Sequence, residues 1–187
     1  PLCWIGAHTR RIKLGTSILQ ISARTPACVA MTAMTMDHLS GGRLILGLGV
    51  SGPQVVEGWY GQAFPKPMGR MREFITLLRQ MLRREGPVTF DGQHYQIPLR
   101  GGSGLGKPLK LITRPLRDHI PFYLGAEGPK NIAMATELCE GWLPLYYSPY
   151  RPEVYADALT GARPGFEIAC PVTVNVNDDA GAALIPV

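Results

Sequence analysis

Short apolar runs alternate with longer amphipathic stretches along this chain. Runs rich in β-branched and aromatic residues predict buried strands at 11–19, 43–47, 120–125, 142–146 and 166–176. Helical spacing or composition predicts helices at 26–36, 70–84, 129–140 and 152–159. The helix at 70–84 has the clearest pattern, because its apolar residues recur three and four positions apart and charged residues take the other side. This alternation predicts an α/β fold with a parallel sheet, either doubly wound or closed into a barrel.

A helix stop separates the first predicted helix from the second predicted strand. Gly41 or Gly42 can take the left-handed conformation that ends a helix. The nearby Asp37 and Arg43 are expected to form a structural ion pair or a solvated turn rather than a reactive site.

One segment, at about 86–119, departs from the α/β alternation. It holds Asp91-Gly92 between two β-prone runs, which is a strong hairpin signal, and then a loop rich in glycine and proline. The chain is otherwise expected to form a single α/β domain over 1–187. A complete barrel needs about 250 residues, so five strands would make only part of one.

Composition narrows the class of protein. The chain has 187 residues, of which 45% are hydrophobic, so it can bury a substantial core. The net charge of +5 comes from dispersed basic residues, which suits an anionic small molecule better than nucleic acid. No apolar run is long enough to cross a membrane and no signal peptide is visible, so a cytoplasmic protein is expected. The four cysteines and four histidines are scattered, which predicts reduced thiols and no metal site.

Two glycine-rich segments match nucleotide-binding patterns only formally. Gly47 to Gly52 reads G-x-G-x-x-G after a strand, but the acidic strand end expected about 20 residues later is missing. It is better interpreted as a loop where a ligand ring can approach the backbone. The segment Gly101 to Lys107 matches a phosphate loop, but Pro108 replaces the hydroxyl residue that would bind magnesium. A surface loop or lid is the better interpretation there.

A third segment, Leu124 to Asn131, is chemically more suggestive. A strand ends in small residues, and Pro129 is well placed as the first residue of the next helix. Free N–H groups, the helix dipole and Lys130 could attract a phosphate, although an ordinary turn with a solvated lysine fits the same residues. Residues 146–148 (Tyr146, Tyr147 and Ser148) could line a substrate pocket or simply pack at the rim.

Four stretches in this order resemble the luciferase-like monooxygenase superfamily, in its F420-dependent oxidoreductase branch. They read RIKLGTSILQISARTPA, MTMDHLSGGRLILGLGVSGPQ, KPMGRMREFITLLRQMLRREGPVTFDGQHYQIP and IPFYLGAEGPKNIAMATELCEGWLP. The resemblance implies a (β/α)8 TIM barrel of the bacterial-luciferase-like type. It also implies that this chain is the central portion of that barrel, with family strands before Pro1 and after Val187.

The resemblance also implies where a cofactor binds. The family's third strand carries a bulge with a non-prolyl cis peptide against the cofactor ring, which falls by position at Ser17-Ile18. The fourth strand and its exit place backbone near the ring. The corresponding residues here are Gly49, Val50 and Ser51. The family's phosphate-binding turn maps onto Gly125, Ala126, Glu127, Gly128, Pro129 and Lys130.

One departure leaves the catalytic residues unknown. Some relatives have a Glu and an Asn after the fourth strand that assist proton transfer, whereas this loop reads Ser51-Gly-Pro-Gln54, with Glu57 the nearest carboxylate. The resemblance implies an oxidoreductase that transfers a hydride between coenzyme F420 and a small organic substrate, with a homodimer common among related barrels. An FMN-dependent monooxygenase on the same fold and a non-catalytic flavin-binding protein remain the alternatives.

Overall fold

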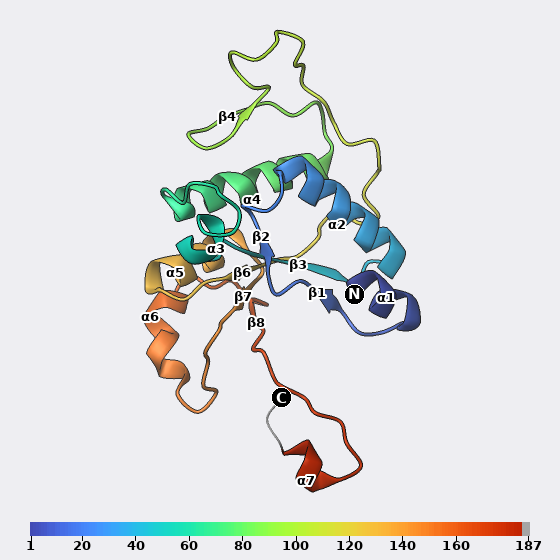
Figure 1. Ribbon diagram of the computed structural model, residues 1–187, viewed down its shortest axis with the longest axis vertical. Coiled ribbons are helices and arrows are strands. Elements are labelled where there is room, and N and C mark those ends of the chain that lie inside the picture. The colour runs from blue at the N-terminus through green and yellow to red at the C-terminus, as the bar shows by residue number, and fades with distance from the viewer. Residues whose placement is uncertain (185–187) are drawn as a thin grey trace.

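A curled parallel sheet forms the centre of the computed structural model, which describes residues 1–184 (Figure 1). Its strands run in the order β1-β3-β6-β7-β8, with β2 also paired to β3. All of these pairings are parallel. The strands are β1 (Leu14–Gly15), β2 (Leu19–Gln20), β3 (Leu44–Gly49), β6 (Phe122–Gly125), β7 (Gly141–Leu143) and β8 (Glu167–Ile168). This sheet confirms the predicted α/β class and has the form of an incomplete barrel.

Helices cover the outer face of the sheet, and α2 and α4 lie along it side by side (Figure 1). The main helices are α2 (Pro26–Ser40), α4 (Pro67–Arg83) and α5 (Pro129–Leu138). Shorter ones are α1 (Leu2–His8), α3 (Pro53–Val56), η1 (Pro152–Tyr155), α6 (Ala156–Leu159) and α7 (Ala180–Ala183). The sequence pattern did not predict α1, α3 or α7, because a helix of one or two turns is too short to show a periodicity. No helix within residues 1–184 is both long and apolar enough to span a membrane.

The core lies between the sheet and α2, α4 and α5. Alternate residues of β3, including Leu44, Leu46 and Leu48, are buried against these helices, as are Phe122 and Leu124 of β6. The intervening residues of each strand therefore face the concave side of the sheet. This alternation decides which side chains can reach a ligand inside the curl.

The ends of α2 show how local chemistry sets its length. Thr25 caps the first turn by accepting a hydrogen bond from the Cys28 N–H, and Gly41 ends the helix in the left-handed conformation with φ of 67°. The predicted stop is therefore confirmed. Asp37 does not pair with Arg43, because Arg117 binds both of its carboxylate oxygens and Arg43 instead donates to backbone carbonyls.

The predicted first strand, 11–19, is interrupted in the structure. It divides into β1 and β2, and the peptide bond between Ser17 and Ile18 in the gap is cis. The cis bond that the resemblance implied is therefore present. Periodicity could not show the interruption, because the residues on either side are equally apolar and β-branched.

The last predicted strand, 166–176, is wrong beyond its first residues. Only Glu167–Ile168 form β8, and the final ladder hydrogen bond runs from the Ala169 N–H to the Trp142 carbonyl. Pro171 has no N–H to donate, so it cannot continue the ladder. The valines that suggested a strand, Val172, Val174 and Val176, are exposed instead.

The excursion after α4 contains the predicted hairpin, with a longer turn than expected. Strands β4 (Phe90–Asp91) and β5 (Gln96–Ile97) pair antiparallel, and four residues join them rather than Asp91-Gly92 alone. The Glu73 carboxylate holds this turn by accepting from the backbone N–H groups of Gln93, His94 and Tyr95. The hairpin lies beyond α2 and α4, away from the strand ends (Figure 1).

Candidate functional site

A cleft of about 570 Å³ lies where the parallel strands end. It is lined by three segments that are far apart in the sequence: Ser17 and Ile18; Gly49, Val50 and Ser51; and Gly125, Ala126 and Glu127. Asn131, Leu143, Pro144, Leu145 and Pro171 complete its wall. Its volume falls within the roughly 300–1,000 Å³ of small-molecule sites, and the carboxyl ends of barrel strands are where such sites form.

The bulge between β1 and β2 forms one wall of the cleft. Thr16 fixes the bulge against β3, because its hydroxyl donates to the Gly47 carbonyl at 2.8 Å and accepts from the Gly47 N–H at 2.9 Å. Beyond it, the Ile18 side chain lies over two glycines of neighbouring strands. A methyl group on Gly49 would lie 3.0 Å from Ile18 Cγ1, and one on Gly125 would lie 2.9 Å from Ile18 Cγ2. The two glycines therefore make room for the apolar side chain of Ile18 at the wall of the cleft.

The exit of β3 contributes a second wall. Ser51 has a φ of 61°, in the left-handed region that a non-glycine residue rarely adopts. Such residues persist where the surrounding structure holds them, and they concentrate at ligand sites. Val50 and Ser51 both line the cleft, so the backbone here turns at the ligand side.

The turn from β6 into α5 forms the third wall. Gly128 is the N-cap of α5 and Pro129 is its first residue, as the sequence predicted. The cap has no side-chain hydrogen bond, Pro129 has no N–H, and the Asn131 N–H donates to the Gly128 carbonyl at 2.9 Å, so the Lys130 N–H is the first-turn donor left available to an anion. Lys130 is also exposed. Gly128, Pro129 and Lys130 adjoin the cleft at this helix end, whereas Gly125, Ala126 and Glu127 line it directly.

Two hydrogen bonds fix this turn to the next strand. The Trp142 indole N–H donates to the Ala126 carbonyl at 2.7 Å, and Trp142 is fully buried. The Leu145 N–H donates to the Glu127 carboxylate at 2.8 Å. The Glu127 side chain is thus engaged in joining two strand exits.

Tyr146, Tyr147 and Ser148 line a separate hollow of about 410 Å³ beside the cleft. The two spaces share Leu145 and Pro171 in their walls. Tyr147 stacks on Tyr155 with ring centroids 5.5 Å apart and meets Trp142 edge-on. The predicted substrate residues are therefore neighbours of the cleft, and Tyr147 also has a packing role.

Sequence reasoning missed several residues that line the cleft. Leu143 could have been found, because it alternates with the buried Trp142 along a short strand and must face the concave side. Asn131 lies in the first turn of a predicted helix, which is also a recognisable position. Pro171 belongs to a segment predicted as a strand, and only the fold brings it to the cleft.

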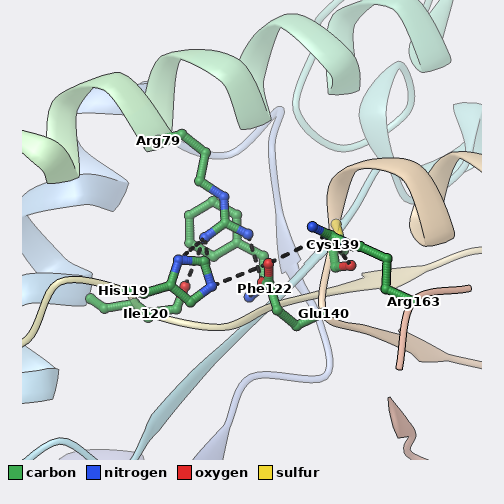
Figure 2. Close-up of polar contacts among 7 residues, drawn as sticks. All are labelled: Arg79, His119, Ile120, Phe122, Cys139, Glu140 and Arg163. Carbon is green, nitrogen blue, oxygen red and sulfur yellow. Dashed lines mark hydrogen bonds and ion pairs between the residues drawn. The ribbon is translucent and has the colours of Figure 1, made fainter. Parts of the chain in front are cut away.

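A charged cluster at the opposite, amino-terminal end of β6 has a structural role (Figure 2). The Glu140 carboxylate accepts from the Phe122 N–H at 2.7 Å and pairs with Arg79 at 2.6 Å and His119 at 3.1 Å. The Arg79 guanidinium also lies 3.7 Å above the centre of the Phe122 ring. Burial alone would raise the pKa of Glu140, but the hydrogen bonds from Phe122 and Arg79 outweigh it, so the pKa is lowered.

The neighbouring Cys139 is not suited to nucleophilic chemistry. Burial raises the pKa of its thiol to about 12, so it stays protonated near neutrality. Through the contacts of Glu140, the charged cluster joins α4, β6 and the end of α5. The candidate functional site is therefore the cleft at the carboxyl end of the strands.

The walls of the cleft suit a planar ring that carries an anionic tail. Ile18 and the two glycines beneath it present an apolar surface, and the start of α5, just after β6, presents the Lys130 N–H and side chain. A flavin or deazaflavin with a phosphate on its side chain has these two parts. Within residues 1–184, no three His, Cys, Asp or Glu side chains are grouped to hold a metal ion.

Comparison with known proteins relates the chain to one family. The family profile described as luciferase-like monooxygenase matches residues 1–185. Rv3520c of Mycobacterium tuberculosis, named for a proposed coenzyme F420-dependent oxidoreductase activity, is 58% identical over 98% of this chain and 56% of its own length. The 5,10-methylenetetrahydromethanopterin reductase of Archaeoglobus fulgidus is 36% identical over 74% of this chain and 38% of its own.

Solved structures show the same fold. The coenzyme F420-dependent tetrahydromethanopterin reductase of Methanopyrus kandleri superposes with a TM-score of 0.77 and 25% identity, over 97% of this chain and 56% of that one. The chain thus spans about half the length of the relatives it matches. Because the family profile covers nearly every residue and the fold agrees, the chain belongs to the luciferase-like monooxygenase family.

Proposed function

We propose that the protein is an F420-dependent oxidoreductase that transfers a hydride between the deazaflavin and a small organic substrate. The observation that carries the proposal is the meeting of the cis-bonded bulge, the β3 exit and the free end of α5 at one cleft. Two of the relatives named above support the choice of coenzyme, since the names of the Mycobacterium tuberculosis and Methanopyrus kandleri proteins specify coenzyme F420. Coenzyme F420, when bound, supplies a ring carbon that gives or accepts the hydride.

The residues of the chain would bind and orient the reactants. Ser17 and Ile18 would support one ring face, and the backbone of Gly49, Val50 and Ser51 would border the ring. The turn from Gly125 to Lys130 would hold the phosphate through N–H groups, the helix dipole and the lysine charge. Fixing the ring in this way leaves its other face for the substrate and excludes water from the reacting atoms.

The proposal is tested by titrating coenzyme F420 into the full-length protein and following fluorescence, with FMN in parallel. Gly128→Trp should lower F420 affinity at least about ten-fold, because the bulky ring would cover the N–H groups that bind the phosphate. A Cβ at Gly128 meets no atom within 4 Å, so the new side chain starts without a clash against the backbone. Gly86→Trp is the matched control, because Gly86 also borders open space.

The outcomes separate the alternatives. Saturable F420 binding that Gly128→Trp weakens and Gly86→Trp does not would support the proposal. Binding of FMN alone would point to an FMN-dependent monooxygenase, and binding of neither would contradict a cofactor role. If bound cofactor is neither oxidised nor reduced by any substrate tried, the protein is a non-catalytic flavin-binding protein.

A further inference from the structure

The hollow of about 410 Å³ beside the cleft is a second space at the carboxyl ends of the strands, because most of its lining residues follow β7 and β8. Leu145 and Pro171 lie in the walls of both spaces. Leu145 is 60% exposed and Tyr146 is 76% exposed, so the described residues leave the hollow open to solvent. Its volume falls within the roughly 300–1,000 Å³ of small-molecule sites. The proposed coenzyme occupies the cleft, which leaves the hollow for a second molecule.

The aromatic wall of this hollow is fixed before any ligand binds. The rings of Tyr147 and Tyr155 stack with centroids 5.5 Å apart, and the Tyr155 ring meets Trp142 edge-on at 5.0 Å. Trp142 is fully buried, so this stack rests on the core of the sheet. The Tyr155 hydroxyl also donates to the Tyr146 carbonyl at 3.0 Å, which joins the two ends of the loop. A ligand therefore pays little to order these rings.

The walls of the hollow are aromatic and uncharged. Its seven lining residues in the described chain include no carboxylate and no Lys, Arg or His side chain. They are Leu145, Tyr146, Tyr147, Ser148, Tyr155, Cys170 and Pro171. The aromatic rings favour a flat ligand ring, and the tyrosine and serine hydroxyl groups can hydrogen-bond to an oxygen atom on it. An ionic group placed here would lose hydration without gaining a partner of opposite charge.

The charges close to the hollow are already engaged. Glu127 lines the cleft rather than the hollow, and its carboxylate accepts from the Leu145 N–H at 2.8 Å. Arg151 and Glu153, in the loop between Ser148 and Tyr155, form an ion pair with each other. The hollow thus differs from the start of α5, where an exposed lysine favours an anion.

We propose that this hollow binds the substrate, and that the substrate is a neutral ring compound bearing a hydroxyl or carbonyl group. This inference rests on the proposed function and names the substrate class of the same site. The coenzyme and the substrate then enter adjoining spaces of opposite character, one with a phosphate turn and the other without charge.

The test measures binding of three naphthalene derivatives to the full-length protein by equilibrium dialysis, with and without coenzyme F420. The probes share one ring system and differ in charge near neutrality: neutral 2-naphthol, anionic 2-naphthoate and cationic 2-naphthylmethylammonium. 2-Naphthol should bind saturably whether or not F420 is bound, and each ion should bind at least about ten-fold more weakly.

Tyr146→Ala tests whether the neutral probe lies in the hollow. Tyr146 is chosen because its ring is exposed, whereas Tyr147 and Tyr155 pack against Trp142. Loss of one aromatic contact should weaken 2-naphthol binding about 3- to 10-fold, while the melting temperature and the F420 affinity stay at their wild-type values. Tyr150→Ala is the matched control, because Tyr150 is 89% exposed in the same loop and does not line the hollow.

Each outcome decides the inference. Preference for 2-naphthol that Tyr146→Ala weakens and Tyr150→Ala does not would support it. Binding of either ion as tightly as 2-naphthol overturns the neutral class. Wild-type affinity in Tyr146→Ala, or competition between 2-naphthol and F420, places the probe outside the hollow and overturns the site. If F420 binds and none of the three probes does, the inference fails while the proposed function stands. If F420 does not bind, the proposed function fails, and the inference fails with it.

Discussion

Replacing Gly47 with alanine should destabilise the protein more than any other single methyl group added to the sheet. A Cβ at this position would overlap the Thr16 carbonyl oxygen and lie 2.9 Å from its carbonyl carbon. It would also lie 2.8 Å from Cδ1 of Leu143. The leucine side chain can rotate away, whereas the Thr16 carbonyl belongs to the backbone of the bulge and can move only if the bulge moves.

The loss in unfolding free energy can be worked out from the contacts that the displaced backbone makes. Inserting a methyl group into a packed site costs about 2 kcal/mol. Moving Thr16 also disturbs the two hydrogen bonds, of 2.8 and 2.9 Å, that its hydroxyl makes with Gly47. Each such bond contributes about 1 kcal/mol, so the total is about 4 kcal/mol. For a chain of this size that corresponds to a melting temperature lower by roughly 8–16 °C.

Urea unfolding followed by circular dichroism measures this loss, with Gly86→Ala as the control. Gly86 has open space around an added Cβ, so its substitution should change the unfolding free energy by less than about 0.5 kcal/mol. If Gly47→Ala falls within about 1 kcal/mol of Gly86→Ala, the bulge is not held rigidly against β3. Thr16 would then not fix the bulge that forms this wall of the cleft.

Three further predictions test other parts of the structure. Gly49→Ala should weaken F420 binding about ten-fold, because the new methyl group would push the Ile18 side chain into the cleft. Adding Ile18→Val to this variant should restore part of the affinity, because valine lacks the Cδ1 atom that the methyl group meets. Folding lowers the pKa of Glu140, so its carboxylate stabilises the protein at pH values above its ordinary pKa of 4.5. This stabilisation is lost as the pH falls through the pKa of the folded state. Glu140→Gln should therefore flatten the pH dependence of the unfolding free energy in acid, measured by urea titration. Arg117→Met leaves the buried carboxylate of Asp37 unpaired and should cost about 3 kcal/mol by chemical denaturation, and adding Asp37→Leu should recover most of it; no recovery would contradict the pairing.

Most of the fold could be predicted because it depends on local patterns. The apolar face of α4, the alanines and methionines of α2 and the short apolar runs of β3, β6 and β7 appear directly in the sequence. The predicted bounds of two strands were wrong where a single residue or bulge interrupted an otherwise regular pattern. Pro171 ended the last strand early, and the Ser17-Ile18 bulge divided the first one. Neither the proline nor the bulge changes the pattern of apolar residues in its segment, so the periodicity could not show where the strand is broken.

Less of the candidate site than of the fold could be predicted from the sequence. The phosphate turn has a chemical signature, because Pro129 after Gly128 marks a helix start without a side-chain cap. The bulge could be located only by resemblance to the family. Leu145 and Pro171 come to the cleft through loops whose course depends on the packing of the whole sheet.

The composition of the cleft explains why the coenzyme is easier to infer than the substrate. On the proposed function, the coenzyme would be bound mainly by backbone and small side chains at Gly49, Gly125 and the start of α5, where position matters more than residue type. Substrate recognition would require side chains of specific shape and charge, and on the same proposal these would be exposed residues after β3 and β7, such as Glu57 and, in the adjoining hollow, Tyr146. Substitutions in those two exits should therefore change the substrate affinity and leave F420 affinity unaltered. A substitution there that weakened F420 binding as strongly as Gly128→Trp would contradict this division of the cleft.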